Sequence, residues 1–341
     1  MNILDYNSIN REEWSRLVLT SSTGNWFQTP EAYDFFASQS DLFKPFAIGL
    51  EHLQSPTSDL QSRLRAVCVG YVTLEKNVLK QKLTRRAIII GGPCLADDCL
   101  DYEVMALMKA VRAQLASEAI YIECRNFNDY SRWKNAFEAE GFMYVPHLNF
   151  HVDCTDKEAM DARLSENRKR QIKKAIKSGV EIAEAQSEQE IADWFVILQE
   201  LYSTKVKTPL FPLSFFLEFY RQGLGKYLLV KYEGKVIGGI MCPILDGKCI
   251  YEWFVCGNDA EYRNQNPSVM ATYAAMEYGN AHGLARFDFM GAGKPNEPYG
   301  VRDFKARFGG DEVEYGRFLC VTKPLLYKLG TIGVKLLKRL K

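Results

Sequence analysis

Two carboxylates in the second half of the chain occupy positions that suit proton transfer. Glu252 lies in an apolar segment, where strand alternation places it on the same face as Phe254 and Cys256. A carboxylate among apolar neighbours has a raised pKa and can accept a proton from an attacking ammonium group. A salt bridge from Lys231 or Lys248 on a neighbouring strand explains the same position equally well.

Asp288 is the second of these carboxylates. It alternates with Phe287 and Phe289 along an apolar strand at 286–290, so its side chain faces away from both rings. The strand leads into a glycine-rich turn at 291–293. Asp288 is therefore a candidate base at a strand end or, alternatively, a cap for that turn.

Lys305 is the candidate cation. It follows Phe304 and precedes a Phe-Gly-Gly turn at 308–310. Taken alone, this lysine is explained by a surface ion pair with a nearby acid such as Asp303 or Asp311. Any functional interpretation depends on the elements that surround it.

Apolar periodicity predicts those elements, and it predicts the same order in each half of the chain: strands, then helix, strand, helix and strand. The last strand of the first half is expected at 142–152, and that of the second half at 313–321. One basic helix is expected at 157–178. Another is expected at 267–282, with Asn266 as its N-cap.

The length of 341 residues exceeds what one hydrophobic core usually supports, so two domains are expected. We place them at 1–153 and 154–322, followed by a basic amphipathic helix at 323–341. The repeated order of elements predicts an α+β fold class.

The composition is that of a folded globular protein, with 47% apolar and 25% charged residues. A net charge of +1 gives no overall attraction to nucleic acid or anionic lipid, so any such attraction must be local. The sequence shows neither a secretory signal nor a membrane-spanning segment, which favours a cytoplasmic protein. Nine cysteines without a C-x-x-C pair are expected to be reduced core residues, and no metal site is predicted.

Three short motifs, in their order and spacing, resemble the FemAB-type aminoacyltransferases, the two-domain branch of the GNAT acyltransferase superfamily. They are a Tyr-Arg pair at 262–263 followed by Pro267, the strand end FDFMG at 287–291, and Phe304-Lys305 followed by the turn at 308–310. The resemblance implies two tandem GNAT-like domains, each a mixed, mostly antiparallel sheet flanked by helices. It also implies transfer of an aminoacyl or other acyl group to an amine of a cell-envelope precursor, as in peptidoglycan synthesis.

The resemblance also implies roles for individual residues. Lys305 would lie at the reacting carbonyl and stabilise the oxyanion or hold the acceptor's carboxylate, Phe304 would shape the pocket, and Glu252 or Asp288 would accept the proton. The residues expected to line the cleft are Tyr251, Trp253, Tyr262, Arg263 and Tyr299.

In the first half, the segments WFQTPEAYDFF at 26–36 and GGPCLADD at 91–98 also resemble the family, where they flank the acceptor cleft. They suggest acceptor contacts through Gln28 and through Asp97 or Asp98. Phe36 stands where members that bind a nucleotide-linked muropeptide have a lysine, which argues against a uridine-nucleotide acceptor.

The acyl donor is the least determined part of the prediction. The turn at 257–266 contains a single glycine, which disfavours a coenzyme A pyrophosphate site. Seven positive charges at 163–177 could follow the phosphates of a charged tRNA, although a solvated helix face explains them as well. The residues expected to contact RNA or phosphate are Arg168, Lys169, Lys173 and Lys174.

The main hypothesis is therefore an aminoacyltransferase that uses charged tRNA as a substrate and holds no permanent cofactor. One alternative is an acyl-CoA-dependent N-acyltransferase acting on a lipid, polysaccharide or small amine, and another is a non-catalytic binding module. The stripe of apolar residues at 325–341 is expected either to pack on the protein or, less favoured, to contact the inner face of an anionic membrane.

Overall fold

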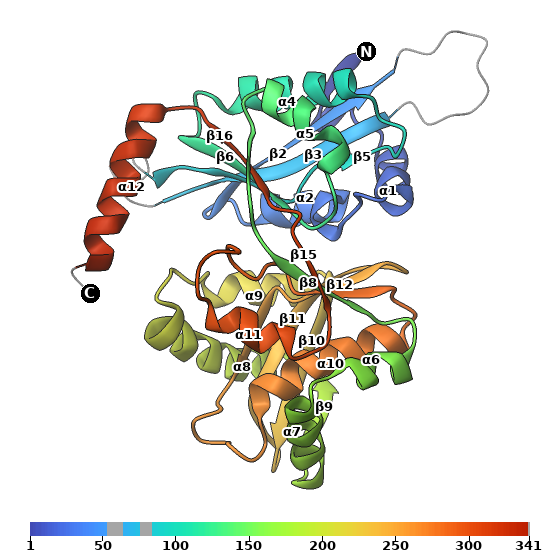
Figure 1. Ribbon diagram of the computed structural model, residues 1–341, viewed down its shortest axis with the longest axis vertical. Coiled ribbons are helices and arrows are strands. Elements are labelled where there is room, and N and C mark those ends of the chain that lie inside the picture. The colour runs from blue at the N-terminus through green and yellow to red at the C-terminus, as the bar shows by residue number, and fades with distance from the viewer. Residues whose placement is uncertain (53–63, 76–83, 340–341) are drawn as a thin grey trace. The chain divides into compact units, whose positions relative to one another are not determined.

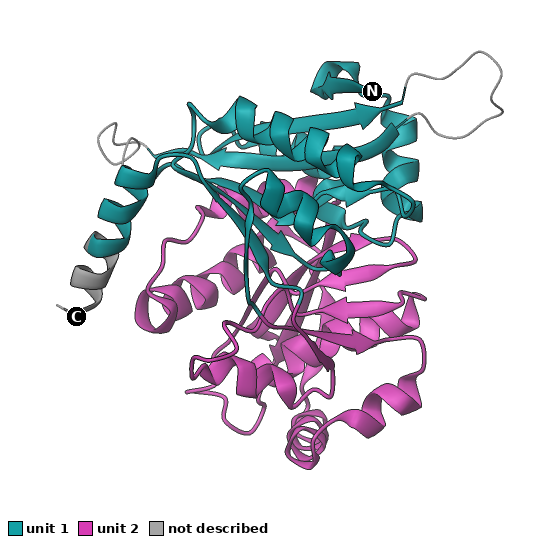
Figure 2. Ribbon diagram, turned by 45° about the horizontal axis from the view of Figure 1, so that its top comes forward, with its two compact units in different colours: residues 1–147, 315–341 teal, residues 148–314 magenta. Residues whose placement is uncertain are grey.

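The computed structural model describes residues 1–52, 64–75 and 84–339 and divides the chain into two units (Figures 1 and 2). Unit 1 comprises residues 1–147 and 315–341, and unit 2 comprises residues 148–314. Each unit contains one eight-stranded mixed sheet with helices packed against it. The predicted α+β class with two similar domains is confirmed.

The strands of unit 1 are β1 (Asn2–Asp5), β2 (Phe43–Glu51), β3 (Leu64–Thr73), β4 (Ala87–Gly91), β5 (Cys94–Leu95), β6 (Tyr121–Asn126), β7 (Met143–Val145) and β16 (Arg317–Val321). Its helices are α1 (Arg11–Thr20), α2 (Pro30–Ser38), α4 (Asp101–Leu115), α5 (Lys134–Ala139) and α12 (Pro324–Arg339), with short 3-10 turns at 6–8, 26–28 and 131–133.

The strands of unit 2 are β8 (Asn149–Asp153), β9 (Glu181–Glu184), β10 (Gly225–Tyr232), β11 (Lys235–Leu245), β12 (Cys249–Tyr251), β13 (Phe254–Gly257), β14 (Arg286–Asp288) and β15 (Asp311–Val313). Its helices are α6 (Lys157–Arg163), α7 (Glu166–Lys177), α8 (Glu188–Leu201), α9 (Leu213–Arg221), α10 (Pro267–Ala281) and α11 (Gly300–Ala306), with a π-helical turn at 202–206.

The two sheets have matching strand orders. Sheet 1 runs β1-β2-β3-β4-β6-β16-β7, and sheet 2, counted from its opposite edge, runs β9-β10-β11-β12-β14-β8-β15. The extra strands also correspond, because β5 pairs with β3 and β13 pairs with β11. In both sheets the fourth and fifth strands pair in parallel. The internal repeat expected from the element order is therefore present.

The domain boundaries differ from the expected ones because the sheets exchange strands. The strand expected at 142–152 is two strands: β7 lies at the edge of sheet 1, and β8 lies between β14 and β15 of sheet 2. The strand expected at 313–321 is likewise divided between β15 in sheet 2 and β16 in sheet 1. Alternation along the chain cannot show this, because both pieces of each segment have strand periodicity.

Helices cover both faces of sheet 2. The neighbouring glycines Gly238 and Gly239 of β11 face opposite sides of the sheet. A Cβ atom on Gly238 would meet Pro267 of α10, and one on Gly239 would meet Trp194 of α8. The core beneath α10 joins β8, β11 and β14 through side chains such as Val152, Ile240 and Phe287. Close approach of both helices thus requires small residues in the middle of the sheet.

The basic helix expected at 157–178 is broken into α6 and α7. Leu164 leaves the helical conformation, and the hydroxyl of Ser165 accepts the backbone N–H of Arg168 at 3.4 Å, which starts a new helix. The break changes the direction of the chain, so the charges do not lie along one continuous face.

All nine cysteines lie in the described residues, where each is buried and none forms a disulfide bond. Among the helices that the structure describes, none has the length and apolarity needed to cross a membrane.

Candidate active site in unit 2

Strand β12 pairs with β14, but its continuation β13 does not, so sheet 2 opens between β13 and β14. Tyr251 of β12 is the parallel partner of Asp288, and the next residue, Glu252, still donates its backbone N–H to the carbonyl of Asp288 at 2.9 Å. Trp253 and Phe254 then both lie opposite Met241, the first by donating its N–H at 3.2 Å and the second as register partner. Two residues against one form a β-bulge, which bends the strand. Among the described strands, β13 continues beside β11 alone.

The side chain of Lys305, on α11, lies at the narrow end (the vertex) of this opening, just beyond the last paired residues of β12 and β14. Its ammonium group donates to the carbonyls of Phe289 and Gly291 at 2.7 and 3.0 Å and lies 2.9 Å from Glu252 Oε1. The side chain is nearly buried, with 8% of the residue exposed. Lys305 and Glu252 were expected to pair with Asp303 or Asp311 and with Lys231 or Lys248, respectively, if they were structural. They pair with each other instead.

The surroundings of Glu252 shift the pKa of its carboxyl. Burial raises the pKa of this carboxyl above its ordinary value, and the ammonium of Lys305 and the hydroxyl of Thr272 only partly oppose that effect. The hydroxyl of Thr272, on α10, donates to Glu252 Oε2 at 3.3 Å. Burial therefore raises the pKa as the apolar surroundings predicted, and the charged neighbour Lys305 opposes that rise.

Asp288 lies across the same pair of strands in a different environment. Its Oδ1 accepts from Asn149 and from the backbone N–H of Met290, both at 2.7 Å, and its Oδ2 lies 3.0 Å from His151 Nε2. Burial alone would raise the pKa of Asp288, but His151, Arg286 and Asn149 hold it below its ordinary value. The carboxylate thus remains ionised and holds the residues around it in place.

The two carboxylates consequently differ in chemical character. A pair of acidic groups whose surroundings push their pKa values in opposite directions is an arrangement that separates proton transfer from structural or electrostatic roles. Glu252 is the better proton acceptor of the two, because a base with a pKa nearer to neutrality works more effectively at neutral pH.

Asn149 and His151 belong to this cluster and were not identified as site residues from the sequence. They occupy alternate positions of β8, and His151 is the register partner of Asp288. Asn149 also accepts the backbone N–H of Gly291 at 2.7 Å and so fixes the turn beneath Lys305. Their spacing of two was visible in the sequence, but the pairing of β8 with β14 was not.

The aromatic residues expected to line a cleft lie in several different environments. Tyr251 is completely buried and therefore does not line an open cleft. Trp253 packs edge-on against Phe215 and Phe219 of α9, at 5.5 and 5.8 Å between ring centroids. Phe304 packs on Phe308 at 5.3 Å. These rings form the surroundings of the opening and not one continuous surface.

The remaining residues of that predicted set lie closer to the surface. Tyr262 is partly buried against Tyr232, with 6.1 Å between ring centroids, and Arg263 is exposed. Tyr299 is exposed, and its ring stands where a Cβ atom on Gly293 would be. Tyr299 therefore covers the turn that connects β14 with α11.

Gln28 of unit 1 cannot contact an acceptor in this structure. It is completely buried, and its amide nitrogen donates to the carbonyls of Val69 and Ile90 at 2.9 and 3.0 Å. Its amide oxygen accepts the N–H of Val69 at 2.8 Å. Asp97 and Asp98 are exposed: Asp97 accepts the N–H of Ser22 at 2.8 Å, and Asp98 forms an ion pair with Arg65 at 2.9 Å.

Asp259 occupies the N-terminus of α10, where a coenzyme pyrophosphate was considered. Its Oδ1 accepts the backbone N–H of Ser268 at 3.1 Å, and its Oδ2 accepts the Ser268 hydroxyl at 2.5 Å. Asn266, the expected cap, has a left-handed backbone with φ of 47° and makes no capping bond with its side chain. The chain's own carboxylate thus satisfies the first free donor of this helix.

The four residues expected to contact phosphate do not act as a set. Arg168 is buried, with its guanidinium over the rings of Phe304 and Phe308 at 4.3 and 4.6 Å. It also donates to the carbonyl of Phe304 at 3.2 Å. Burial, reinforced by the charge of Arg307, lowers its pKa to about 10. Arg168 anchors α7 to α11, so its prediction as a surface phosphate contact is wrong.

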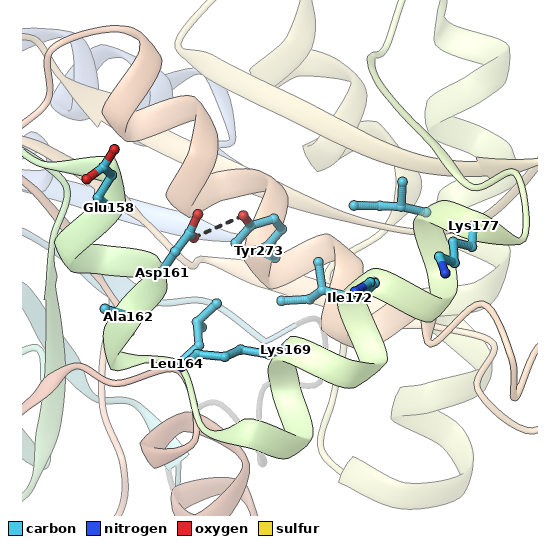
Figure 3. A pocket seen from close by; sticks show the side chains of 10 residues that line it. Glu158, Asp161, Ala162, Leu164, Lys169, Ile172, Lys177 and Tyr273 are labelled. Atoms are coloured by element: carbon cyan, nitrogen blue, oxygen red, sulfur yellow. Dashed lines mark hydrogen bonds between the residues drawn. The ribbon is translucent and has the colours of Figure 1, made fainter.

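Three lysines of α7 border a groove of about 690 Å³ between α6, α7 and α10 (Figure 3). Lys169 forms an ion pair with Glu166 at 3.0 Å, and Lys174 donates to Asn264 at 2.7 Å outside the groove lining. The groove is lined by Glu158, Asp161, Ala162, Leu164, Lys169, Ile172, Lys173, Ile176, Lys177 and Tyr273. None of these residues belongs to the Lys305 cluster.

Within the described residues, no group of three or more histidine, cysteine or acidic side chains has the geometry to bind a metal ion. The two histidines near the domain boundary lie in different units: His147 of unit 1 accepts from the guanidinium of Arg317 at 2.9 Å, and His151 belongs to unit 2.

Comparison with known proteins agrees with this architecture. Residues 162–305 match an acetyltransferase (GNAT) domain model, which ends at Lys305 and lies within unit 2. The crystal structure of FemX superposes with a TM-score of 0.72 at 13% identity, covering 96% of this chain and 99% of FemX. No curated protein sequence matches the chain.

Two further structures have the same arrangement over most of their length. The C-terminal domain of a putative lysylphosphatidylglycerol synthetase from Agrobacterium fabrum has a TM-score of 0.55 at 13% identity and 91% coverage of both chains. A tandem GNAT protein from the clavulanic acid biosynthesis pathway has a TM-score of 0.51 at 8% identity, covering 94% of this chain and 98% of its own. The domain match and these folds support an acyltransferase, with the tandem GNAT-like, FemAB-like architecture that the sequence motifs predicted.

Proposed function

We propose that unit 2 transfers an aminoacyl group from charged tRNA to an amine of a cell-envelope precursor, with the opening between β13 and β14 as the reaction site. The observation that carries this proposal is the buried Glu252–Lys305 pair at the vertex of that opening. A strand edge left unpaired by a β-bulge offers backbone groups to a ligand, and bulges often lie next to active sites.

In this proposal the acceptor amine attacks the ester carbonyl of the donor, a C–N bond forms, and the C–O bond to the tRNA ribose breaks. Glu252 takes the proton from the attacking amine and then passes it to the leaving ribose oxygen, which restores the ionised carboxylate. All three ammonium protons of Lys305 have acceptors in the resting structure. Protonation of Glu252 weakens its ion pair, so one N–H of Lys305 becomes available to the oxyanion at the moment negative charge develops there.

The choice of donor rests on the N-terminus of α10. A coenzyme A pyrophosphate at that position would have to displace the carboxylate of Asp259 from Ser268 and would meet its negative charge. A tRNA ester has no pyrophosphate to place there. The lysines that border the α7 groove, Lys169, Lys173 and Lys177, are the proposed contacts for RNA phosphates in place of Arg168.

The acceptor is proposed from the resemblance to FemAB-type enzymes and from the FemX fold. Asp97 and Asp98 remain the proposed acceptor contacts of unit 1, and Gln28 is withdrawn from that role.

A second candidate is an acyl-CoA-dependent N-acyltransferase, which the match to an acetyltransferase domain favours. Incubation of the protein with charged tRNA, with acetyl-CoA and with pools of amine acceptors separates the candidates. Transfer from charged tRNA supports the proposal. Transfer from acetyl-CoA alone replaces it with the second candidate, and binding of an acceptor without transfer from either donor would indicate a non-catalytic binding module.

A further inference from the structure

Helix α12 is attached to unit 1 near its beginning and extends away from the sheet of that unit (Figures 1 and 2). Just before the helix, the hydroxyl of Thr322 donates to the carbonyl of Ala119 at 2.5 Å and Lys323 Nζ donates to the carbonyl of Ser117 at 2.8 Å. Within the helix, the ring of Tyr327 packs edge-on against Tyr121 at 5.4 Å. These contacts hold the first turn of α12 against β6.

The apolar side chains of the following turns face solvent. Leu325, Leu329 and Ile332 are 80%, 63% and 46% exposed. Their spacing of four and three residues places them on one face of the helix, and Leu336 continues the same spacing. We expected this stripe to pack on the protein, but for the three residues whose side chains are described that expectation is wrong.

The charged residues of this segment are all of one sign. Residues 324–341 contain five cations, Lys328, Lys335, Lys338, Arg339 and Lys341, and no acidic residue. The whole chain has a net charge of +1, so residues 1–323 carry −4. The exposed apolar stripe therefore lies in a segment that carries excess positive charge, whereas the rest of the chain carries excess negative charge.

We propose that α12 docks on an anionic lipid surface, with the Leu325-Leu329-Ile332 face among the acyl chains and Lys328 at the headgroups. A helix with an apolar stripe and a basic remainder lies in the plane of such an interface. Anionic headgroups attract a juxtaposed basic segment, and that attraction falls off within a Debye length. At 16 residues the helix is about 24 Å long, which suits lying along the surface. Lipid binding by α12 does not depend on the transfer reaction proposed for unit 2.

Two other occupants fit the observations less well. RNA would use the cations but would leave the exposed leucines without a partner. A second copy of α12 would bury the leucines but would bring two helices of like charge together. An anionic lipid surface satisfies both features of the helix at once.

Flotation of the full-length protein with vesicles tests the proposal. We expect binding to vesicles that contain phosphatidylglycerol to be at least about tenfold stronger than to phosphatidylcholine vesicles and to weaken as salt is raised. The double variant Leu325→Glu and Leu329→Glu should abolish binding. Lys328→Gln should weaken binding to anionic vesicles only.

Leu19→Glu is the matched control, because Leu19 is a leucine of helix α1 in the same unit with 48% exposure. It should leave vesicle binding unchanged, and circular dichroism should show that all variants are folded. Equal loss of binding in Leu19→Glu and in the α12 variants would contradict the proposal. So would concentration-dependent dimerisation that Leu325→Glu removes, or RNA binding by the wild-type helix without vesicle binding.

Discussion

In each sheet a central strand parts from its neighbour within the described residues, and a different side chain fills each of these two gaps. In sheet 1, β3 and β4 pair at Tyr71↔Ile88, and continuing that register would pair Val69 with Ile90. The amide of Gln28 stands between these two residues and bonds to both. In sheet 2, Lys305 fills the gap where β13 and β14 part.

The physical difference between the two gaps lies in charge and access. Gln28 is a neutral amide that is completely buried, and the three hydrogen bonds that it makes are all to backbone groups. Lys305 is charged, slightly exposed, and bonded in part to a carboxylate whose own protonation can change. A sealed neutral gap can only stabilise its sheet. A charged gap with a titratable partner can also carry chemistry, and for this reason we propose that the reaction takes place in unit 2.

The largest expected effect is on the reaction. Lys305→Ala should lower turnover by about 10²-fold, the size that loss of one preorganised charge stabiliser produces. Lys305→Arg should rescue poorly, because a planar guanidinium does not fit a site shaped for a compact ammonium. Initial rates of acyl transfer, with a melting curve for each variant, measure the effect. Full activity of Lys305→Ala would make this lysine as purely structural as Gln28.

The corresponding change in sheet 1 should affect stability and not turnover. Gln28→Leu leaves the N–H and carbonyl of Val69 and the carbonyl of Ile90 without this partner, at a cost of about 2 kcal/mol in the free energy of unfolding. Urea unfolding measures the loss. Gln114→Leu, at an exposed position of α4, is the control and should change stability little. If Gln28→Leu lowers turnover without lowering stability, the contrast between the two gaps fails.

A smaller effect is expected for the donor. Asp259→Ser removes the negative charge at the N-terminus of α10, and a change of about 1 kcal/mol there corresponds to roughly fivefold tighter binding of coenzyme A. Calorimetric titration of wild type and variant with coenzyme A measures it. Tight binding by the wild type would show that the carboxylate does not exclude a pyrophosphate.

The smallest expected effect concerns acid stability. Because the folded-state pKa of Asp288 is below its ordinary value, the stability that its ionised form contributes is present above that ordinary value. It is lost as the pH falls through the lowered pKa. Asp288→Asn should therefore reduce stability at neutral pH, and its difference from wild type should shrink as the pH falls below the ordinary pKa of an aspartate. Melting temperatures across that range test the prediction, and a constant difference would contradict it.

Much of the fold could be predicted from local pattern. The helix expected at 267–282 is α10. The order of elements repeats as expected, because period-two and 3.6-residue spacing report on each element separately. The pairing of segments was not predictable in this way, so the exchange of β8 and β16 between the sheets went undetected.

The candidate site was likewise predictable from the sequence only in part. The sequence by itself determined the residue types at 252, 288 and 305, the apolar surroundings of Glu252 and the one-glycine turn before α10. Only the tertiary structure decided that Lys305 binds Glu252, that His151 holds Asp288, that Asp259 caps α10, and that Arg168 and Gln28 are buried. Each of these contacts joins residues on different elements, and the direction of a pKa shift depends on those neighbours. Local periodicity places a side chain on a face of its own element, whereas packing decides what that face meets.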